Sequence, residues 1–121
     1  MNFRKNNIRI NAIAPTAGTR MTEDLMPEQI AQILSPEAVT AGLLTLCDDD
    51  APNRTILCAG AGGYATANMF ETEGIFLAID EQSPEAVRAK WLAVTNQENQ
   101  AVLDAGVKQS EKFVKKAMTA L

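Results

Sequence analysis

The sequence contains no histidine, two cysteines, one tryptophan and one tyrosine. Without histidine, one chain cannot form a Ser-His-Asp triad, a histidine-ligated metal centre or a histidine general base. The two cysteines, Cys47 and Cys58, are too few to form a structural zinc site by themselves. Both lie in apolar runs, so we expect them to be reduced, buried, small hydrophobic side chains. We therefore expect no metal site and no catalytic residue of these kinds.

The sequence also lacks any apolar run of about 18 residues, which is the length that a membrane-spanning helix needs. Its basic beginning is followed by no apolar signal core. Eleven Lys and Arg stand against fifteen Asp and Glu, and this formal charge of −4 disfavours nucleic acid, whose phosphates attract clustered cations. We therefore expect a cytoplasmic protein that binds neither nucleic acid nor a membrane. The 121 residues favour a single domain with one modest core.

Two segments have the pattern of β-strands. The alternation over residues 8–14 predicts a short strand, which Pro15 ends because proline cannot donate to a ladder. The small residues 16–19 predict a loop. The nearly continuous apolar run over residues 54–59 predicts a second, buried strand.

Helix-start patterns occur at several places. Ser35-Pro36-Glu37 and Ser83-Pro84-Glu85 each place an N-cap serine before a proline at the first helical position. Another helix is predicted after Pro27. The apolar residues of the last helical stretch, which Gly106 interrupts, are predicted to face inward and its lysines outward. The inner residues expected there are Val102, Val107, Phe113, Val114 and Met118, and the outer ones are Lys108, Lys112, Lys115 and Lys116.

A glycine-rich segment allows two interpretations. Residues 60–65 fit the Gly-x-Gly-x-x-Gly/Ala pattern of dinucleotide-binding loops, and Asp80 follows at the spacing of a ribose-binding acid. However, residues 64–73 would have to form the crossover helix, and they have no apolar stripe and include mediocre helix formers. The alternative is a glycine turn that leads into a hairpin, with extended pieces at 64–70 and 74–79.

A more specific pattern lies near the beginning of the chain. Residues 7–15 read Asn-Ile-Arg-Ile-Asn-Ala-Ile-Ala-Pro, which resembles the Ile-Arg-Val-Asn-x-Ile-x-Pro-Gly segment of short-chain dehydrogenases/reductases. Residues 14–22, 35–39, 59–62 and 83–91 resemble one subgroup of that family. This subgroup contains the dehydrogenase units of peroxisomal multifunctional β-oxidation enzymes and their bacterial relatives. The resemblance covers roughly residues 5–95.

The resemblance implies an α/β fold. It predicts the C-terminal fragment of a Rossmann-like doubly wound sheet over residues 1–80, with two parallel strands, lid helices and a hairpin, and a helical tail over residues 81–121. In this family the Gly-x-Gly turn after the last parallel strand has no phosphate role. The family's catalytic Tyr-x-x-x-Lys, its catalytic Ser and its N-terminal glycine loop have no counterpart here, since Tyr64 is followed four residues later by Asn68.

By the same resemblance, one loop contacts the nicotinamide end of NAD or NADP. Its expected cofactor-binding residues are Pro15, Ala17, Gly18, Thr19, Arg20 and Thr22. Thr16 stands where most of the family has glycine, and whether Thr19 or Thr22 meets the carboxamide stays open. Residues 21–34 match the substrate lid, whose apolar residues either line an apolar substrate or pack in the core. These residues are Met26, Ile30 and Leu34.

We therefore expect a fragment of an NAD(P)-dependent dehydrogenase for a hydroxyacyl thioester or a similar hydroxy compound. It would be inactive alone and need not bind the cofactor by itself. A parallel pair of strands with an open sheet edge also predicts either a homo-oligomer or a refolded, helix-rich arrangement that hides the edge. The alternative is a non-catalytic structural or interaction module that self-associates through this edge and the C-terminal helices.

Overall fold

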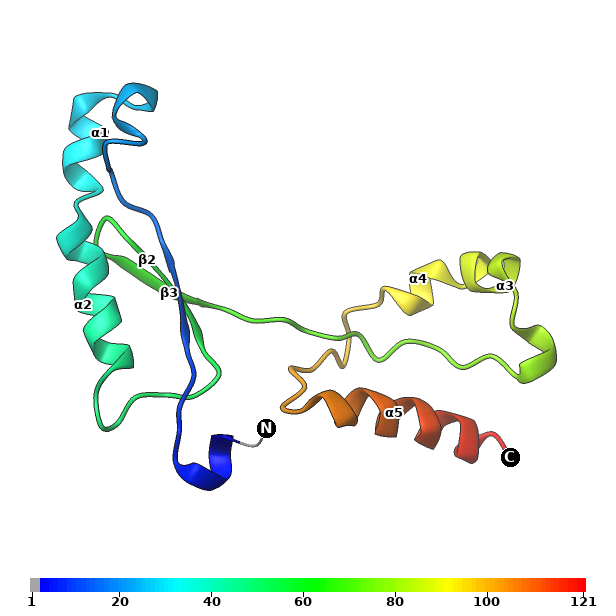
Figure 1. The fold of residues 1–121 in the computed structure, drawn as a ribbon. Helices are drawn as coiled ribbons and strands as arrows, with labels where there is room; N and C mark the ends of the chain where they lie inside the picture. Colours follow the sequence, from blue (N-terminus) through cyan, green and yellow to red (C-terminus); the bar gives the residue numbers. More distant parts are fainter. Residues whose placement is uncertain (1–2) are drawn as a thin grey trace. The chain divides into compact units, whose positions relative to one another are not determined.

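The structure is a computed structural model that describes residues 3–121 (Figure 1). The chain divides into two compact units, of which the first ends at Asn68 and the second spans Met69–Leu121. Within residues 3–121, no helix is both long and apolar enough to cross a membrane.

A mixed three-stranded sheet forms the centre of the first unit. Strands β1 (Ala12–Pro15) and β2 (Ile56–Gly60) pair in parallel, with Ile13 beside Leu57. β2 then pairs antiparallel with β3 (Gly63–Ala67), so the strand order is β1-β2-β3. The predicted parallel pair is confirmed. The hairpin lies earlier than predicted, because β2 and β3 form it across residues 60–63, whereas residues 64–70 and 74–79 do not pair with each other.

The helices of the first unit begin near the predicted positions. Ser35 is the N-cap residue of α2 and Pro36 its first residue, although the serine side chain makes no capping hydrogen bond. The helical elements of this unit are η1 (Phe3–Asn6), η2 (Glu23–Leu25), α1 (Glu28–Ile33) and α2 (Pro36–Leu46).

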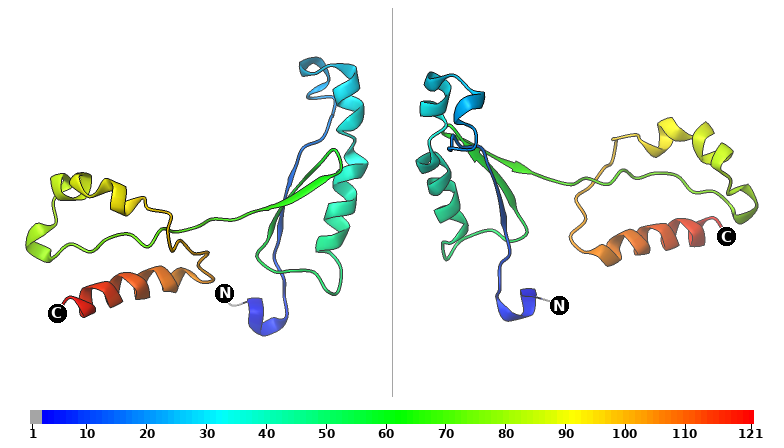
Figure 2. Two further views of the ribbon diagram at one scale, coloured as in Figure 1. Left: turned by 180° about the vertical axis from the view of Figure 1, so that it is seen from behind. Right: turned by 45° about the horizontal axis from the view of Figure 1, so that its top comes forward.

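Helix α2 lies along one face of the sheet (Figures 1 and 2). The buried Gly42 brings the helix backbone close to β2 and β3, because a Cβ at this position would lie 3.1 Å from Leu57 Cδ2 and 3.3 Å from the Tyr64 ring. The Tyr64 hydroxyl donates a 2.7 Å hydrogen bond to the Ala38 carbonyl of α2. Ala59, which is 3% exposed, is the buried apolar residue of this layer.

The opposite face of the sheet is apolar and open. Because side chains alternate along a strand, the residues on this face follow from the strand pairing. They are Ala12, Ala14, Ile56, Cys58, Ala65 and Ala67. The alanines are exposed, Ile56 is 41% exposed and Cys58 is half-buried. A sheet with parallel strands usually has both faces covered, whereas residues 3–68 provide a layer over only one face of this sheet.

The first strand begins later than predicted, at Ala12 and not at residue 8. Asparagine side chains join the residues before β1 to the segment that precedes β2. The Ile10 N–H donates to Asn53 Oδ1 at 2.8 Å, and Asn11 Oδ1 accepts from the Thr55 N–H at 3.0 Å. Asparagine side chains thus replace part of the ladder, and Ile10 remains 50% exposed.

Several residues that were predicted to be buried are open to solvent. Both cysteines are free as expected, but Cys47 at the end of α2 is exposed. On α1, the lid residue Ile30, for which core packing was one of two expectations, is also exposed, as is its neighbour on the helix Ile33. Their apolar spacing is correct for an inner face, but within residues 3–68 nothing covers that face.

The second unit is built from short helices and one long helix. The Ser83 hydroxyl accepts from the Ala86 N–H at 3.1 Å, which confirms the predicted N-cap. Gly106 begins the last helix, as the predicted break indicated. The elements are η3 (Ile79–Glu81), α3 (Pro84–Ala89), α4 (Trp91–Val94) and α5 (Gly106–Thr119). The extended piece predicted at 74–79 forms no strand, and a single bridge joins Glu71 to Ala101 instead.

Residues 71–73 form a polar hub that holds the second unit together. The extended segment that contains them runs between the α3–α4 helices and α5 (Figure 2). Lys112 of α5 forms an ion pair with Glu71 and donates to the Thr72 carbonyl at 2.9 Å. Lys116 pairs with Glu73 at 2.6 Å, and the Thr72 hydroxyl donates to the Val94 carbonyl at 2.7 Å. One tripeptide therefore contacts both α5 and the end of α4.

These contacts lower the pKa of both hub carboxyls. The hydrogen-bonded Lys112 ammonium, followed by the Gln109 amide at 2.5 Å, holds the pKa of Glu71 below its ordinary value of 4.5. The Lys116 ammonium does the same to the pKa of Glu73. Each carboxylate is thus stabilised in its charged form while α5 is docked.

The close packing at the end of the sheet predicts that Gly60→Ala destabilises the first unit. A Cβ at residue 60 would lie 2.5 Å from the Thr16 carbonyl oxygen and 2.8 Å from Thr16 Cβ, so backbone must move. We expect a loss of about 1–3 kcal/mol, the usual cost of overpacking. It is measured as faster amide exchange of the β1 and β2 ladder. Gly106→Ala is the control, because a Cβ there meets no atom within 4 Å, and unchanged β1–β2 exchange in both variants would contradict the prediction.

The hub predicts that α5 detaches in acid. Since folding lowers the pKa of Glu71 and Glu73, their contribution is complete above pH 4.5 and is lost as the pH falls through the lower folded values. Amide protection of Glu71 and Ala101 should therefore fall below pH 4.5 while β1–β2 protection persists. Glu71→Gln should weaken this pH dependence. Equal loss of protection in both units would show that the hub is not the acid-sensitive part.

Candidate functional site

The predicted cofactor loop, residues 15–22, leaves the carboxyl end of β1. In open sheets with parallel strands, ligands bind outside the carboxyl ends of the strands. The loop therefore lies where ligands bind in such sheets, at the carboxyl end of a parallel strand. Pro15 is the last residue of β1, and the loop continues to η2.

The first part of the loop is held by the neighbouring strand. The Thr16 N–H donates to the Ala59 carbonyl at 2.8 Å, which extends the parallel ladder beyond Pro15. Thr16 lies so close to Gly60 that a side chain at residue 60 would meet it. The threonine that stands where the related family has glycine is thus accommodated by a glycine on the adjacent strand.

The middle of the loop is held by helix α1. The Gly18 N–H donates to the Leu34 carbonyl at 2.6 Å, and a Cβ on Gly18 would lie 3.0 Å from the Ala31 carbonyl oxygen. Ala17 and Gly18 are half-buried by these contacts, whereas Thr19 and Arg20 are exposed. The loop therefore presents its second half to solvent.

The two threonines of the loop differ in how their hydroxyls are used. The Thr22 hydroxyl donates to the Thr19 carbonyl at 3.1 Å and accepts from the Thr19 N–H at 3.0 Å. The Thr19 hydroxyl accepts from the Met21 N–H at 3.3 Å and donates to no residue in the described part of the chain. Thr22 thus closes the turn, and Thr19 keeps a free hydroxyl donor.

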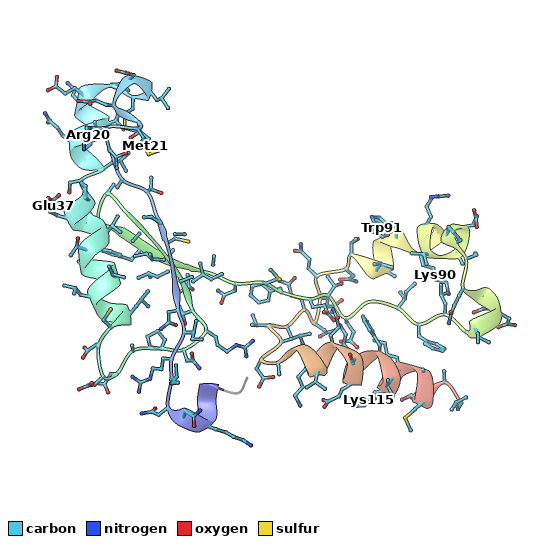
Figure 3. The ribbon with its side chains drawn as sticks, viewed as in Figure 1. Arg20, Met21, Glu37, Lys90, Trp91 and Lys115 are labelled. Carbon is cyan, nitrogen blue, oxygen red and sulfur yellow. The ribbon has the colours of Figure 1, made fainter. Side chains whose placement is uncertain are left out.

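A shallow cavity of about 250 Å³ lies at the exposed half of the loop. Gly18, Thr19 and Arg20 of the predicted set line it, and Figure 3 shows Arg20 and Met21 on this part of the loop. Glu23 and Ala31 also line it, although the sequence did not indicate them. Of the other predicted residues, Pro15, Ala17 and Thr22 do not line this cavity.

The volume of the cavity and its free hydrogen-bond donors limit which ligands it can bind. Its volume is below the roughly 300–1,000 Å³ of usual ligand pockets. The Arg20 N–H donates to no group within residues 3–121, so it can bind an incoming acceptor together with the Thr19 hydroxyl. The loop can therefore form one wall of a ligand site.

The glycine segment at 60–63 is a hairpin turn and not a dinucleotide-binding loop. Gly60 pairs with Gly63, and Ala61 and Gly62 both have positive φ, of 52° and 78°. This is the backbone of a type I′ hairpin turn. Residues 63–67 form a strand where the dinucleotide interpretation requires a helix, so that interpretation is wrong. In the described residues, no group of three or more His, Cys, Asp and Glu side chains gathers as a metal site would.

Comparison with curated proteins gives relatives of two kinds. Mouse peroxisomal multifunctional enzyme type 2 is 41% identical over 91 residues, which is 73% of this chain and 12% of that protein. A putative short-chain type dehydrogenase/reductase of Mycobacterium tuberculosis is 33% identical over 93 residues, which is 76% of this chain and 32% of that protein. The chain therefore spans about a third or less of these relatives. No protein-family model matches it.

Comparison with solved structures supports the fold. The full-length peroxisomal multifunctional enzyme type 2 of Drosophila melanogaster matches with a TM-score of 0.74 over 92% of this chain and 20% of that protein, at 23% identity. This match confirms the α/β, Rossmann-like fragment that the sequence predicted. The chain is thus homologous to part of the peroxisomal multifunctional enzymes and of the short-chain dehydrogenases/reductases.

Proposed function

We propose that this chain is the C-terminal part of an NAD(P)-dependent short-chain dehydrogenase domain, and that it is inactive by itself. The observation that supports this proposal is the uncovered face of the sheet. Six small or apolar residues of three strands lie on that face, and β1 forms an open parallel edge beside it. Both features are what a doubly wound sheet has where further strands and helices join it.

The inactivity follows from the chemistry of the family. A short-chain dehydrogenase moves a proton with a tyrosine whose pKa is lowered by a lysine four residues later and by the cofactor. In this chain the residue four positions after Tyr64 is Asn68. The Tyr64 hydroxyl is also bound to the Ala38 carbonyl, so it serves the packing of α2 on the sheet.

The cofactor loop would supply the wall at the nicotinamide end. Dehydrogenases of this family generally use NAD or NADP, and the loop lies at the strand end where such a cofactor binds. Of the two candidate threonines, Thr19 is the better partner for a carboxamide because its hydroxyl donor is free. Thr22 would act indirectly by holding the turn that presents Thr19.

The substrate class is proposed from the relatives. A hydroxyacyl thioester or similar hydroxy compound would fit a lid with exposed apolar residues, and α1 with the turn before it presents Leu25, Ile30 and Ile33. Leu25 and Ile33 are 80% and 59% exposed, so they are not core residues of the described unit. An apolar acyl group is the kind of ligand that such a surface would cover.

A second candidate function is a non-catalytic module that self-associates. It is favoured by the large apolar surface that this chain leaves open, which includes Met21, Leu92 and Met118. Monomeric proteins rarely expose so many large apolar residues. A homo-oligomer would cover part of this surface without any further chain.

The fragment proposal predicts no turnover of NADH or NADPH with a ketoacyl thioester by the chain alone. The test also uses a chimera in which the matched 93 residues of the M. tuberculosis relative are replaced by the corresponding residues of this chain. We expect the chimera to keep the activity of its parent within about tenfold, because the replaced part forms one wall and one sheet edge. Turnover by the isolated chain, or a folded chimera without activity, would contradict the proposal.

The loop geometry predicts different effects of the two threonines in that chimera. Thr19→Val should raise the KM for the cofactor by about tenfold, the value of one hydrogen bond, with little change in stability. Thr22→Val should instead lower the stability of the loop, measured as faster exchange of the Thr19 N–H. A larger KM effect from Thr22→Val in a fully protected loop would reverse the assignment.

A further inference from the structure

A cavity of about 880 Å³ lies within the second unit, where it is bordered by Leu77, α3 and the start of α4. Its volume falls within the roughly 300–1,000 Å³ of usual ligand pockets. All the residues that line it belong to residues 69–121, and none of them belongs to the cofactor loop or to the hub. The cavity is therefore a candidate ligand site that the enzyme proposal does not use.

The walls of the cavity are mainly apolar. Leu77, Pro84, Val87 and Trp91 contribute them. Val87 is 39% exposed and Trp91 is 56% exposed, so a ligand in the cavity can cover both side chains. Because covering them removes apolar surface from water, the walls favour a ligand with an apolar body.

Two polar side chains of the cavity have free hydrogen-bond donors. The Arg88 guanidinium forms no ion pair and no hydrogen bond within residues 3–121, although Glu85 lies three residues before it on α3. The Ser83 hydroxyl accepts a hydrogen bond as the N-cap of α3, and it donates its own proton to no described residue. The Gln82 amide, by contrast, already donates to the Leu77 carbonyl at 3.1 Å.

The charge of the cavity selects the charge of its ligand. No Asp or Glu of residues 3–121 lines it, and Arg88 is the charged residue among those that do. A carboxylate can accept two parallel hydrogen bonds from a guanidinium, which is the geometry that arginine favours. A cationic ligand would meet the guanidinium charge with no carboxylate of the cavity to offset it. Apolar walls beside one free cation therefore favour an amphiphilic anion over an amphiphilic cation.

We propose that this cavity binds an amphiphilic monocarboxylate, whose apolar body covers Val87 and Trp91 and whose carboxylate pairs with Arg88. The ligand is a free organic acid, because the carbonyl of a thioester carries no charge for the guanidinium to bind. No residue of the cofactor loop takes part, so the inference does not rest on the proposed function.

The test uses the full chain and the fluorescence of Trp91, which is its one tryptophan and lines the cavity. Figure 3 shows Trp91 and Lys90 at the junction of α3 and α4. We expect sodium decanoate, below micelle-forming concentrations, to shift the emission saturably to shorter wavelength, because it covers the exposed indole. Decyltrimethylammonium has the same alkyl chain and the opposite charge, and it should bind at least about tenfold more weakly.

Two substitutions that remove one positive charge each separate Arg88 from the general charge of the unit. Glutamine is a good helix former at both positions, and Lys90 does not line the cavity. Arg88→Gln should weaken the binding of decanoate about tenfold and leave that of uncharged 1-decanol unchanged, which shows that the cavity is still formed. Lys90→Gln should leave the binding of both compounds unchanged. An equal loss of decanoate binding in the two variants would overturn the pairing with Arg88.

Lipid vesicles distinguish a free acid from a membrane surface. Phosphatidylglycerol vesicles also combine negative charge with alkyl chains, but residues 69–121 carry eight Asp and Glu against six Lys and Arg, so we expect them not to shift the emission of Trp91. A shift with the vesicles and none with decanoate would overturn the proposal in favour of a membrane contact. The lack of any saturable shift with decanoate would overturn the site itself. Both outcomes leave the enzyme proposal intact, because that proposal is tested by turnover of the chimera.

Discussion

The parallel pairing of β1 with β2 is the constraint on which the rest of the first unit depends. Parallel strands need a connection long enough to return the chain, and here α1 and α2 supply it. That connection places α2 over one face and leaves Ile56, Cys58 and their alanine neighbours on the other. Nothing in residues 3–68 covers this second face. The same pairing therefore explains both the covered face and the open face of the sheet within residues 3–68.

Local patterns predicted the elements well because they depend on neighbouring residues. Ser83 caps α3 and Ser35 precedes α2, since proline and serine set the backbone of a helix start. Burial was predicted poorly because it depends on layers that the pattern does not contain. Ile30 and Cys47 have the spacing of inner residues, yet the described chain provides no layer over them. The late start of β1 had no visible pattern, because two asparagine side chains replace the ladder there.

The candidate site was predicted by resemblance, and the structure gives its residues different tasks. Gly18 permits the close approach to α1, Thr22 closes the turn, and Thr19 and Arg20 face the solvent. The contact of Thr16 with Gly60 joins residues that are 44 positions apart, so no local pattern could have predicted it. Ala31 was missed for the same reason, since it reaches the cavity through the packing of α1 on the loop.

The second unit shows how charge placement can override an amphipathic pattern. In isolation, α5 would bury its apolar side and expose its lysines, as its sequence predicts. Glu71 and Glu73 lie two residues apart on an extended segment, and Lys112 and Lys116 lie one helical turn apart, so the two pairs match. Once both pairs form, Val114 and Met118 lie away from the segment that holds the helix, and they are 56% and 66% exposed. A polar attachment of this kind holds the helix through its lysines and leaves much of its apolar surface exposed.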